Sequence, residues 1–374
     1  MSAPNLATRA PALVAWLDAH AETLDADATL AAEVLPQLAG AGLPRLGVPV
    51  ELGGSGGTLH DAIGSIADVA GHSFAAAFVL WGQRVFIEYL LQSPNRALRD
   101  RLLPTLLTGQ LAGATGLSNV MKYLAALEPL QVRAADAPSV NGQRAWRVNG
   151  ALPWITNLRQ QGFVAAAAAD REAGGPPLIF ALASGAPGIT RGDDLDLIAL
   201  RGSNTASLRM DNAPLGEDAL LTDDAPTWLA QLRPAFLGLQ CGMVLGLTRR
   251  SLAAALEGGA GSRAIIGGDA ARLTERMDAI AAALNSGLAD GAFIDRPARL
   301  FELRIALTDV LHEANALELQ AGGGLGYLRG RSSVARRQRE AAFVPIVTPS
   351  IVQIKHELAA QAKRTRPVAE AATA

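Results

Sequence analysis

The residues best suited to chemistry in this 374-residue chain are few and isolated. Lys122 is the only lysine in the first 354 positions of a chain that otherwise uses arginine as its basic residue. Cys241 is the single cysteine, and its apolar surroundings predict a core thiol that forms neither an internal disulfide nor part of a cysteine-rich metal site. The histidines are too scattered to predict a bound metal. Lys122 is therefore an isolated cation and a candidate functional residue.

The composition favours a folded protein with more than one packed core. Hydrophobic residues make up 49% of the chain, and the formal net charge is −2, so no general attraction to nucleic acid or to an anionic membrane follows. The N-terminus lacks a basic leader followed by an apolar block, and the longest apolar stretch, Ala235–Leu247, is about two thirds of a membrane span. We expect a cytoplasmic protein that binds neither nucleic acid nor membranes.

Hydrophobic spacing divides the chain into three regions. Apolar residues at three- and four-residue intervals predict a helical domain over residues 1–112, interrupted by a glycine-rich loop at Leu46–Gly57. Short segments rich in β-branched residues and turn pairs predict a β domain over residues 113–222. Helical spacing returns over residues 223–374 and predicts a four-helix bundle. The expected fold class is mostly α with a central β domain.

Three local predictions within these regions carry particular weight. The segment Ala145–Asn157 is expected to form a strand, a tight turn at Asn149-Gly150 and a second strand. The alanine run at 165–169 is assigned to a strand, although alanine favours helix by intrinsic propensity. The glycine-rich segment Gly258–Asp269 is expected to be a linker between bundle helices, and residues after Arg366 to be a frayed tail.

Four motifs in this order resemble those of the acyl-CoA dehydrogenase superfamily of flavoproteins. They are Trp154-Ile-Thr-Asn157, Gly202-Ser-Asn-Thr205 before an alternating strand, Arg233-Pro234 at the head of a bundle helix, and Gln320-Ala-Gly-Gly-Gly-Leu-Gly-Tyr327. The resemblance covers nearly the whole chain and implies a helical N-terminal domain, a middle β-barrel-like domain and a C-terminal four-helix bundle. It also implies FAD as the cofactor, bound where the β domain meets the bundle.

The resemblance implies a role for particular residues. Trp154 and Thr156 correspond to the strand beside the flavin ring, where an indole offers a flat wall and a threonine offers hydrogen bonds. The glycines of the last motif, where the backbone approaches the FAD of a neighbouring subunit, imply a homodimer or homotetramer. If an insertion of about five residues is allowed, Arg263 aligns with a family arginine that reaches the cofactor of the partner subunit. The implied cofactor-binding residues are Leu117, Ser118, Trp154, Thr156, Arg263, Gln320, Gly323 and Gly324.

The segment before the β domain departs from the family pattern. Ser118 retains a hydroxyl, but Leu124 stands where the family has a serine, and Lys122 lies in a loop that the family normally makes of small residues. Two interpretations of Lys122 are open: a cation for the FAD pyrophosphate or an anionic substrate, and a solvated surface lysine. An alternative alignment takes Glu128-Pro129 as a displaced Glu-Pro pair of the family. Arg233 is expected near the substrate pocket, or as a helix-start arginine paired with a carboxylate.

The most informative departure is the absence of the usual base. Acyl-CoA dehydrogenation removes a proton α to a thioester, and most members use a glutamate just before the last helix. Thr348 occupies that position here, as a predicted N-cap followed by Pro349 at the first helical position. Leu232 fills the alternative position of the family's glutamate. The conceivable substitutes, each with a simpler interpretation as a surface residue or ion-pair partner, are His356, Glu340 and Glu357.

Three functions remain open from the sequence. The first is an FAD-dependent oxidoreductase resembling acyl-CoA dehydrogenases, which acts on a CoA thioester or a related small substrate. The second is a flavin monooxygenase or desulfinase of the same fold, because neither chemistry requires the missing glutamate. The third, from another class, is a non-catalytic homologue or ligand-binding protein.

Overall fold

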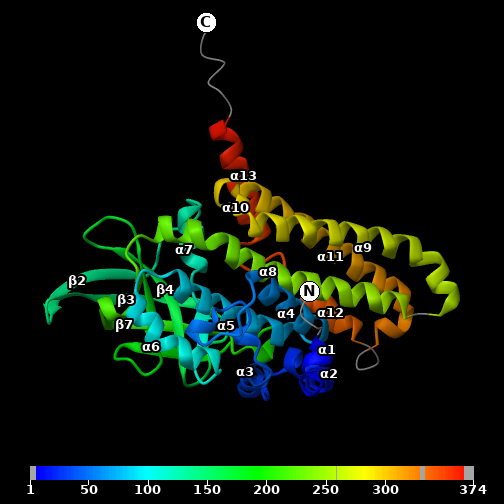
Figure 1. Ribbon diagram of the computed structural model, residues 1–374, viewed down its shortest axis with the longest axis horizontal. Coiled ribbons are helices and arrows are strands. Elements are labelled where there is room, and N and C mark those ends of the chain that lie inside the picture. The colour runs from blue at the N-terminus through cyan, green and yellow to red at the C-terminus, as the bar shows by residue number, and fades with distance from the viewer. Residues whose placement is uncertain (1–5, 258, 329–332, 366–374) are drawn as a thin grey trace, which may run out of the picture.

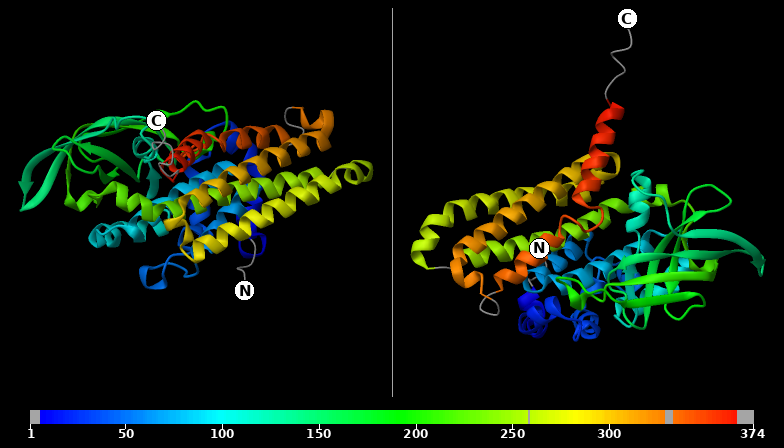
Figure 2. Two further views of the ribbon diagram at one scale, coloured as in Figure 1. Left: turned by 90° about the horizontal axis from the view of Figure 1, so that it is seen from above. Right: turned by 180° about the vertical axis from the view of Figure 1, so that it is seen from behind.

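The structure, a computed structural model, describes residues 6–257, 259–328 and 333–365. It has a helical N-terminal region, a central mixed sheet and long C-terminal helices, so the predicted fold class is confirmed (Figure 1). The sheet occupies one end of the molecule, and the long helices extend from it towards the opposite end (Figures 1 and 2).

The N-terminal helices begin at side chains that satisfy the first backbone N–H groups. Thr58 and Asp61 form a capping box at α4, and the side chains of Ser73 and Asn95 accept hydrogen bonds from the first turns of α5 and α6. The segment predicted as a glycine-rich loop is a connection that contains the short turn η2. The elements are α1 (Leu6–Arg9), α2 (Pro11–Ala26), α3 (Ala31–Gly40), η1 (Leu43–Arg45), η2 (Val50–Leu52), α4 (Leu59–His72), α5 (Phe74–Gln92) and α6 (Arg96–Leu107).

Helix α5 forms the centre of the molecule, because every residue from Phe74 to Leu90 is buried. Among the described residues it is the one helix long and apolar enough to cross a membrane by length and composition, and 94% of its apolar window is buried inside the protein. Helix α5 packs against α4 and α8 and against strand β1. It is therefore a core helix that joins all three regions.

The β region is a mixed sheet in the order β6-β7-β3-β2-β4-β5-β8, with β1 paired to β4. Strands β1 and β4 run parallel, whereas β3 and β7 run antiparallel. The alanine run lies in β4 as predicted, where its backbone pairs with β1 on one side and β5 on the other and its side chains are buried. The strands are β1 (Ala112–Thr115), β2 (Arg133–Val140), β3 (Gln143–Ile155), β4 (Phe163–Arg171), β5 (Leu178–Ala183), β6 (Ile189–Asp194), β7 (Ala206–Gly216) and β8 (Leu220–Thr222), with turns η3 (Arg201–Ser203) and η4 (Glu217–Ala219).

The predicted turn at Asn149-Gly150 is wrong, because β3 continues through it as one strand. The register against β7 shifts between Val148 and Gly150, which is a bulge rather than a chain reversal. Gly150 has a φ of +138°, and its Cα lies so close to Val132 that a side chain would clash. The glycine therefore serves a bulge, and Asn141-Gly142 makes the turn between β2 and β3.

Two predictions about the C-terminal helices are also wrong. The expected linker Gly258–Asp269 is helical from Ala260, because Ala270, Leu273 and Met277 anchor one face of α9 while Gly261, Gly267 and Gly268 face open space. Arg233-Pro234 lies inside α8, since Asp224 caps that helix nine residues earlier. The helices are α8 (Ala225–Leu256), α9 (Ala260–Ala289), α10 (Ala292–Asp295), α11 (Pro297–Gly326), α12 (Val334–Phe343) and α13 (Ile351–Thr365). The predicted tail after Arg366 lies outside the described residues.

A single buried amide joins α5 to the sheet. Gln83, with no exposed surface, donates through Nε2 to the carbonyl oxygens of Leu106 (2.8 Å) and Leu111 (3.0 Å). Its Oε1 accepts from the backbone N–H of Gly113 (2.7 Å) and from Nδ2 of Asn157 (2.9 Å). One side chain thereby fixes α5 relative to β1 and to the residues after β3.

We expect Gln83→Leu to lower the free energy of unfolding by about 3 kcal/mol, because it leaves several buried polar groups without partners. Urea unfolding followed by circular dichroism measures this loss. The matched control is Gln143→Leu, since Gln143 is exposed on β3. A Gln83→Leu variant as stable as this control would contradict the assigned role.

Candidate functional site

A cavity of about 710 Å³ opens where the sheet meets the helices. Its lining comes from α5, β3, α8 and α12, from the segment 115–131 that contains α7 (Ser118–Leu124), and from the loop 196–200 before η3. Small-molecule sites in proteins have volumes of roughly 300–1,000 Å³. The cavity is therefore large enough to enclose a planar cofactor or a substrate of similar size.

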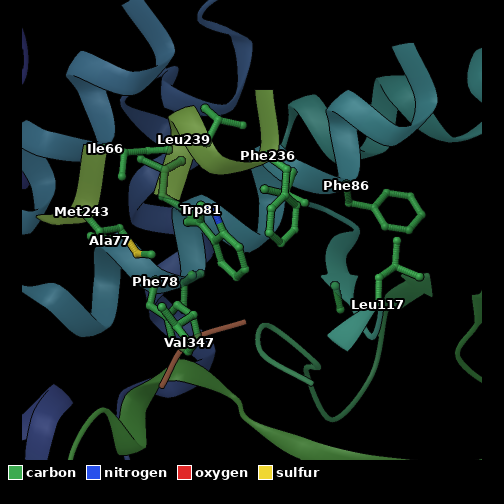
Figure 3. Packing of buried hydrophobic residues seen from close by; sticks show 14 of the residues in the cluster. Ile66, Ala77, Phe78, Trp81, Phe86, Leu117, Phe236, Leu239, Met243 and Val347 are labelled. Atoms are coloured by element: carbon green, nitrogen blue, oxygen red, sulfur yellow. The ribbon is translucent and has the colours of Figure 1, made fainter. Parts of the chain in front are cut away.

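The inner wall of the cavity consists of aromatic rings from three helices. Phe78 and Trp81 on α5 stack at a centroid distance of 5.5 Å and an interplanar angle of 12°. Phe343 at the end of α12 meets Phe78 edge-on at 4.9 Å, and Phe236 on α8 meets Trp81 edge-on at 5.4 Å. Figure 3 shows Trp81 between Phe78 and Phe236, with Val347 beside Phe78. These mutual contacts make an apolar, aromatic wall.

The β-sheet side of the cavity combines an exposed indole with a group of hydroxyls. Trp154 at the end of β3 is 56% exposed, although most tryptophans are largely buried. Thr156 Oγ1 lies 3.2 Å from Thr205 Oγ1, which lies 2.7 Å from Ser203 Oγ. The structure thus brings the Trp154–Asn157 motif and the Gly202–Thr205 motif together at one edge of the cavity.

Several residues expected at the site from sequence line this cavity. Leu117 is only 1% exposed and lies directly before α7, so its side chain belongs to the core beside the cavity. The predicted roles towards a cofactor or substrate stay predictions. The predicted residues that line the cavity are Ser118, Lys122, Trp154, Thr156 and Thr348.

Lys122 lies in helix α7 rather than in the expected loop. Its Nζ is 2.8 Å from Glu128 Oε1, with side-chain exposures of 37% and 51%. Both residues line the cavity, so the lysine and the glutamate of the alternative Glu-Pro alignment form one ion pair there. The pair is solvent-accessible, and its attraction is therefore modest and sensitive to salt.

The segment before the last helix differs from its predicted form. The prediction of Thr348 as N-cap is wrong, because α13 begins at Ile351 and Ser350 Oγ accepts from the backbone N–H of Gln353 (3.2 Å). The Thr348-Pro349 peptide is cis. Thr348 nevertheless lines the cavity, as do Ser350 and Gln353.

Both carboxylates that line the cavity among the described residues are paired with cations. Glu128 pairs with Lys122, and the 89% exposed side chain of Asp196 lies 3.0 Å from Arg201. The conceivable substitute bases are elsewhere, since Glu340, His356 and Glu357 do not line the cavity. The part of the cavity that the structure describes therefore offers no dry, unpaired carboxylate as a base.

A buried ion pair supports the floor of the cavity. Arg339 lines the cavity and donates through Nε and Nη2 to Asp25 Oδ2 at 3.0 and 2.5 Å. Asp25 Oδ1 also accepts from the backbone N–H of Leu200, another lining residue, at 3.0 Å. Burial holds the pKa of Asp25 above its usual range, although Arg339 counteracts the shift. This pair links α2, α12 and the loop before η3.

Glu340 belongs to a neighbouring buried cluster rather than to the cavity. Its Oε1 accepts from Arg336 Nη1 at 2.7 Å, while Oε2 has no partner among the described residues. Burial raises the pKa of this carboxyl, and the nearby arginine lowers it less strongly. Its partners and position fit a role in joining α12 to the N-terminal helices.

Five residues predicted at the site lie away from the cavity of this chain. Arg233 stands over the ring of Phe301 at 5.6 Å inside the helical layer. The start of α9 and the end of α11 lie together at the end of the molecule opposite the sheet (Figures 1 and 2). The glycine motif is helical up to Gly326 except at Gly323, whose φ is +51°. The remaining four residues, all at this far end, are Arg263, Gln320, Gly323 and Gly324.

Sequence reasoning missed the aromatic wall and the Asp25–Arg339 pair. Phe78 and Trp81 lie three residues apart, which is a helical spacing, but α5 is buried all round and its pattern does not mark one face. Asp25 and Arg339 are 314 residues apart, and no local signal connects them. Phe343 could have been found from the sequence, because it stands directly before the segment that carries the catalytic glutamate in most family members.

Comparisons with known proteins agree with this arrangement. Residues 13–110 match the family described as acyl-CoA dehydrogenase, N-terminal domain. The mitochondrial isovaleryl-CoA dehydrogenase of Pongo abelii is 27% identical over 181 residues, which are 47% of this chain and 41% of that protein. The chain thus matches less than half the length of this curated relative.

Solved structures extend the likeness to the whole fold. A glutaryl-coenzyme A dehydrogenase in complex with glutaryl-CoA has a TM-score of 0.76 at 19% identity and covers 97% of both chains. KijD3 in complex with FMN and an amino-sugar nucleotide has a TM-score of 0.76 at 20% identity, over 96% of this chain and 93% of that one. At these identities the likeness establishes the fold.

We expect Arg339→Met to lower the free energy of unfolding by about 3 kcal/mol at pH 7, because Asp25 is left as an unpaired buried charge. The raised pKa of Asp25 means that stability falls as pH rises through that pKa, and Arg339 offsets part of this loss. The difference between wild type and variant should therefore shrink as the pH is lowered and Asp25 becomes protonated. Urea unfolding at several pH values measures it.

The control for this prediction is the double variant Asp25→Asn with Arg339→Met. In the Asp25→Asn background, Arg339→Met should lower the free energy of unfolding by less than it does in the wild type. An equal loss in both backgrounds, or a loss that does not change with pH, would show that the ion pair does not carry the effect.

Proposed function

This protein is a member of the acyl-CoA dehydrogenase superfamily, and from this premise we propose that it is a flavin-dependent oxidoreductase with FAD in the cavity between sheet and helices. The observation that carries the proposal is the meeting of Trp154, Thr156 and Ser118 at one wall of a 710 Å³ cavity whose opposite wall is aromatic. A planar ring between these walls would contact the indole of Trp154 on one side and aromatic side chains on the other.

The residues present fit a flavin. Nδ2 of Asn119 and Nε2 of Gln353 are buried and lack hydrogen-bond partners in the described structure, and both residues line the cavity. Unpartnered amide donors at a cavity wall match a ligand rich in carbonyl and ring-nitrogen acceptors. Ser118, Thr156 and Thr205 add hydroxyls at the sheet side. A flavin would supply hydride or electron transfer, and these side chains would bind and orient it.

The proposed substrate is small and carries an apolar reacting part, in keeping with the aromatic wall. A CoA thioester is the first candidate, because the family model and the isovaleryl-CoA dehydrogenase match are of acyl-CoA dehydrogenases. The second candidate function is a monooxygenase or desulfinase. It is favoured by Thr348 at the usual base position and by the ion pairing of both lining carboxylates.

The proposed assembly is a homodimer or homotetramer. Arg263, Gln320, Gly323 and Gly324 lie at the far end of the molecule, so they reach a flavin only if it is bound to another copy. Ile265 and Tyr327, near these residues in sequence, are 82% and 85% exposed, which suits a surface covered by a second chain. A cytoplasmic location remains part of the proposal.

A direct experiment measures flavin binding. Wild-type protein purified with added FAD should retain a flavin absorption spectrum after desalting, and Trp154→Ala should raise the Kd for FAD by about tenfold, since one stacking contact is lost. Trp16→Phe is the control, because Trp16 lies on α2 outside the cavity. Absence of bound and of rebound flavin in the wild type would favour the non-catalytic homologue.

The spectra also separate the candidate activities. Anaerobic bleaching of the bound flavin by a saturated acyl-CoA is the outcome expected of a dehydrogenase. Oxygen consumption in the presence of a flavin reductase and a substrate is the outcome expected of a monooxygenase.

The Lys122–Glu128 pair leads to a second prediction, which concerns the effect of each charge on the affinity for FAD. Lys122→Met should weaken FAD binding about twofold to fivefold, whereas Glu128→Gln should strengthen it by a similar factor, because the glutamate neutralises the lysine. Both effects should decrease at high salt. Titration of flavin fluorescence at two ionic strengths measures them. Unchanged affinity in both variants would leave Lys122 as a solvated surface residue.

A further inference from the structure

The guanidinium of Arg304 on α11 is buried without an acidic partner among the described residues. Its exposed fraction is 0%, and burial holds its pKa below the usual range of arginine. A buried unpaired charge is costly, and an apolar residue of similar volume would often be at least as stable. The presence of this arginine therefore points to something other than packing.

The hydrogen bonds of Arg304 lead to the wall of the cavity. Nη2 donates to the carbonyl oxygen of Val344 at 2.9 Å, and Nε donates to Oε1 of Gln240 at 2.9 Å. The Nε2 of Gln240 in turn donates to the carbonyl oxygen of Thr348 at 3.0 Å. Nη1 bonds the hydroxyl of Thr308 one turn further along α11. Arg304 and Gln240 thus hold both ends of the segment Val344–Thr348.

This segment shapes the cavity where the usual base would lie. Ile346, Val347 and Thr348 line the cavity, as does Phe343 directly before the segment. Within the segment, the backbone N–H groups of Ile346 and Val347 both donate to the carbonyl oxygen of Phe343. The carbonyl oxygens at its two ends are held from the side of α8 and α11. The orientation of the lining side chains therefore depends on donors that do not themselves line the cavity.

We propose that Arg304 is a positioning residue of the site, which acts through Gln240 and the carbonyl oxygens of Val344 and Thr348 to fix the wall against the bound cofactor or substrate. The proposal rests on the proposed flavin site for its functional meaning. A residue with only a packing role would be replaceable by an apolar side chain without effect on the ligand. A positioning residue is not, because small displacements of a site's lining weaken binding and reactivity.

The experiment compares three full-length variants with the wild type. Arg304→Met removes all donors, Arg304→Lys keeps one charged donor, and Gln240→Glu keeps an acceptor for Arg304 but removes the amide that bonds Thr348. We measure the Kd for FAD by fluorescence titration, the absorption spectrum of the bound flavin, thermal stability without flavin, and hydrogen exchange of the peptide 343–350.

Arg304→Met should raise the Kd for FAD about tenfold, shift the bound flavin spectrum and speed exchange in the peptide 343–350. Arg304→Lys should recover part of each change. Gln240→Glu is the decisive variant, because its carboxylate still accepts from Arg304 but cannot donate to the carbonyl oxygen of Thr348. It should still weaken FAD binding and speed exchange near Thr348.

The proposal is overturned if Arg304→Met and Gln240→Glu change thermal stability alone, with wild-type affinity, spectrum and exchange in the peptide 343–350. If the wild type binds no FAD, the proposed flavin function fails. Hydrogen exchange then still decides whether Arg304 fixes the wall, so the two failures are distinguishable. If Arg304→Met does not fold, Arg304→Lys and Gln240→Glu carry the test.

Discussion

The buried amide of Gln83 is the interaction on which the geometry of the cavity depends. It satisfies backbone groups at the end of α6 and in β1, and it accepts from the side chain of Asn157. Gln83 lies two residues after Trp81, and Asn157 directly follows Thr156. The same node therefore sets the distance between the aromatic wall on α5 and the hydroxyls at the end of β3. A second polar contact, between the Tyr89 hydroxyl on α5 and Thr115 Oγ1 at the end of β1 (2.6 Å), supports the same arrangement.

The charged groups around the cavity all have hydrogen-bond or ion-pair partners. At the mouth, Lys122 and Glu128 neutralise each other, and at the floor Asp25 holds Arg339. Behind the wall, Arg304 donates its hydrogen bonds to neutral oxygens. The interior is left apolar and aromatic, with hydroxyls and amides at its edges. Such a lining favours a flat ligand with many hydrogen-bond acceptors over a compact ion.

The sequence predicted those parts of the site that local patterns encode. Trp154 and Thr156 lie on a recognisable strand, and the alanine run was assigned to β4 correctly because short apolar runs between turns favour strands. The bulge at Gly150 was mistaken for a turn, since both use a glycine after asparagine. The Asp25–Arg339 and Gln240–Thr348 contacts join residues more than 100 positions apart, and the chain has to fold before they exist.

The missing base bears on which chemistry the fold supports. A threonine hydroxyl at position 348 is too weakly basic to remove a proton α to a thioester, and the carboxylates at the mouth are hydrated and already paired. A base recruited from them would have to break an ion pair and lose its hydration before it reached the aromatic wall. Reactions in which oxygen or a leaving group takes up the electrons place no such demand on the protein. The aromatic wall and the hydroxyls at its edge fit the second proposed function, a monooxygenase or desulfinase, without such a base.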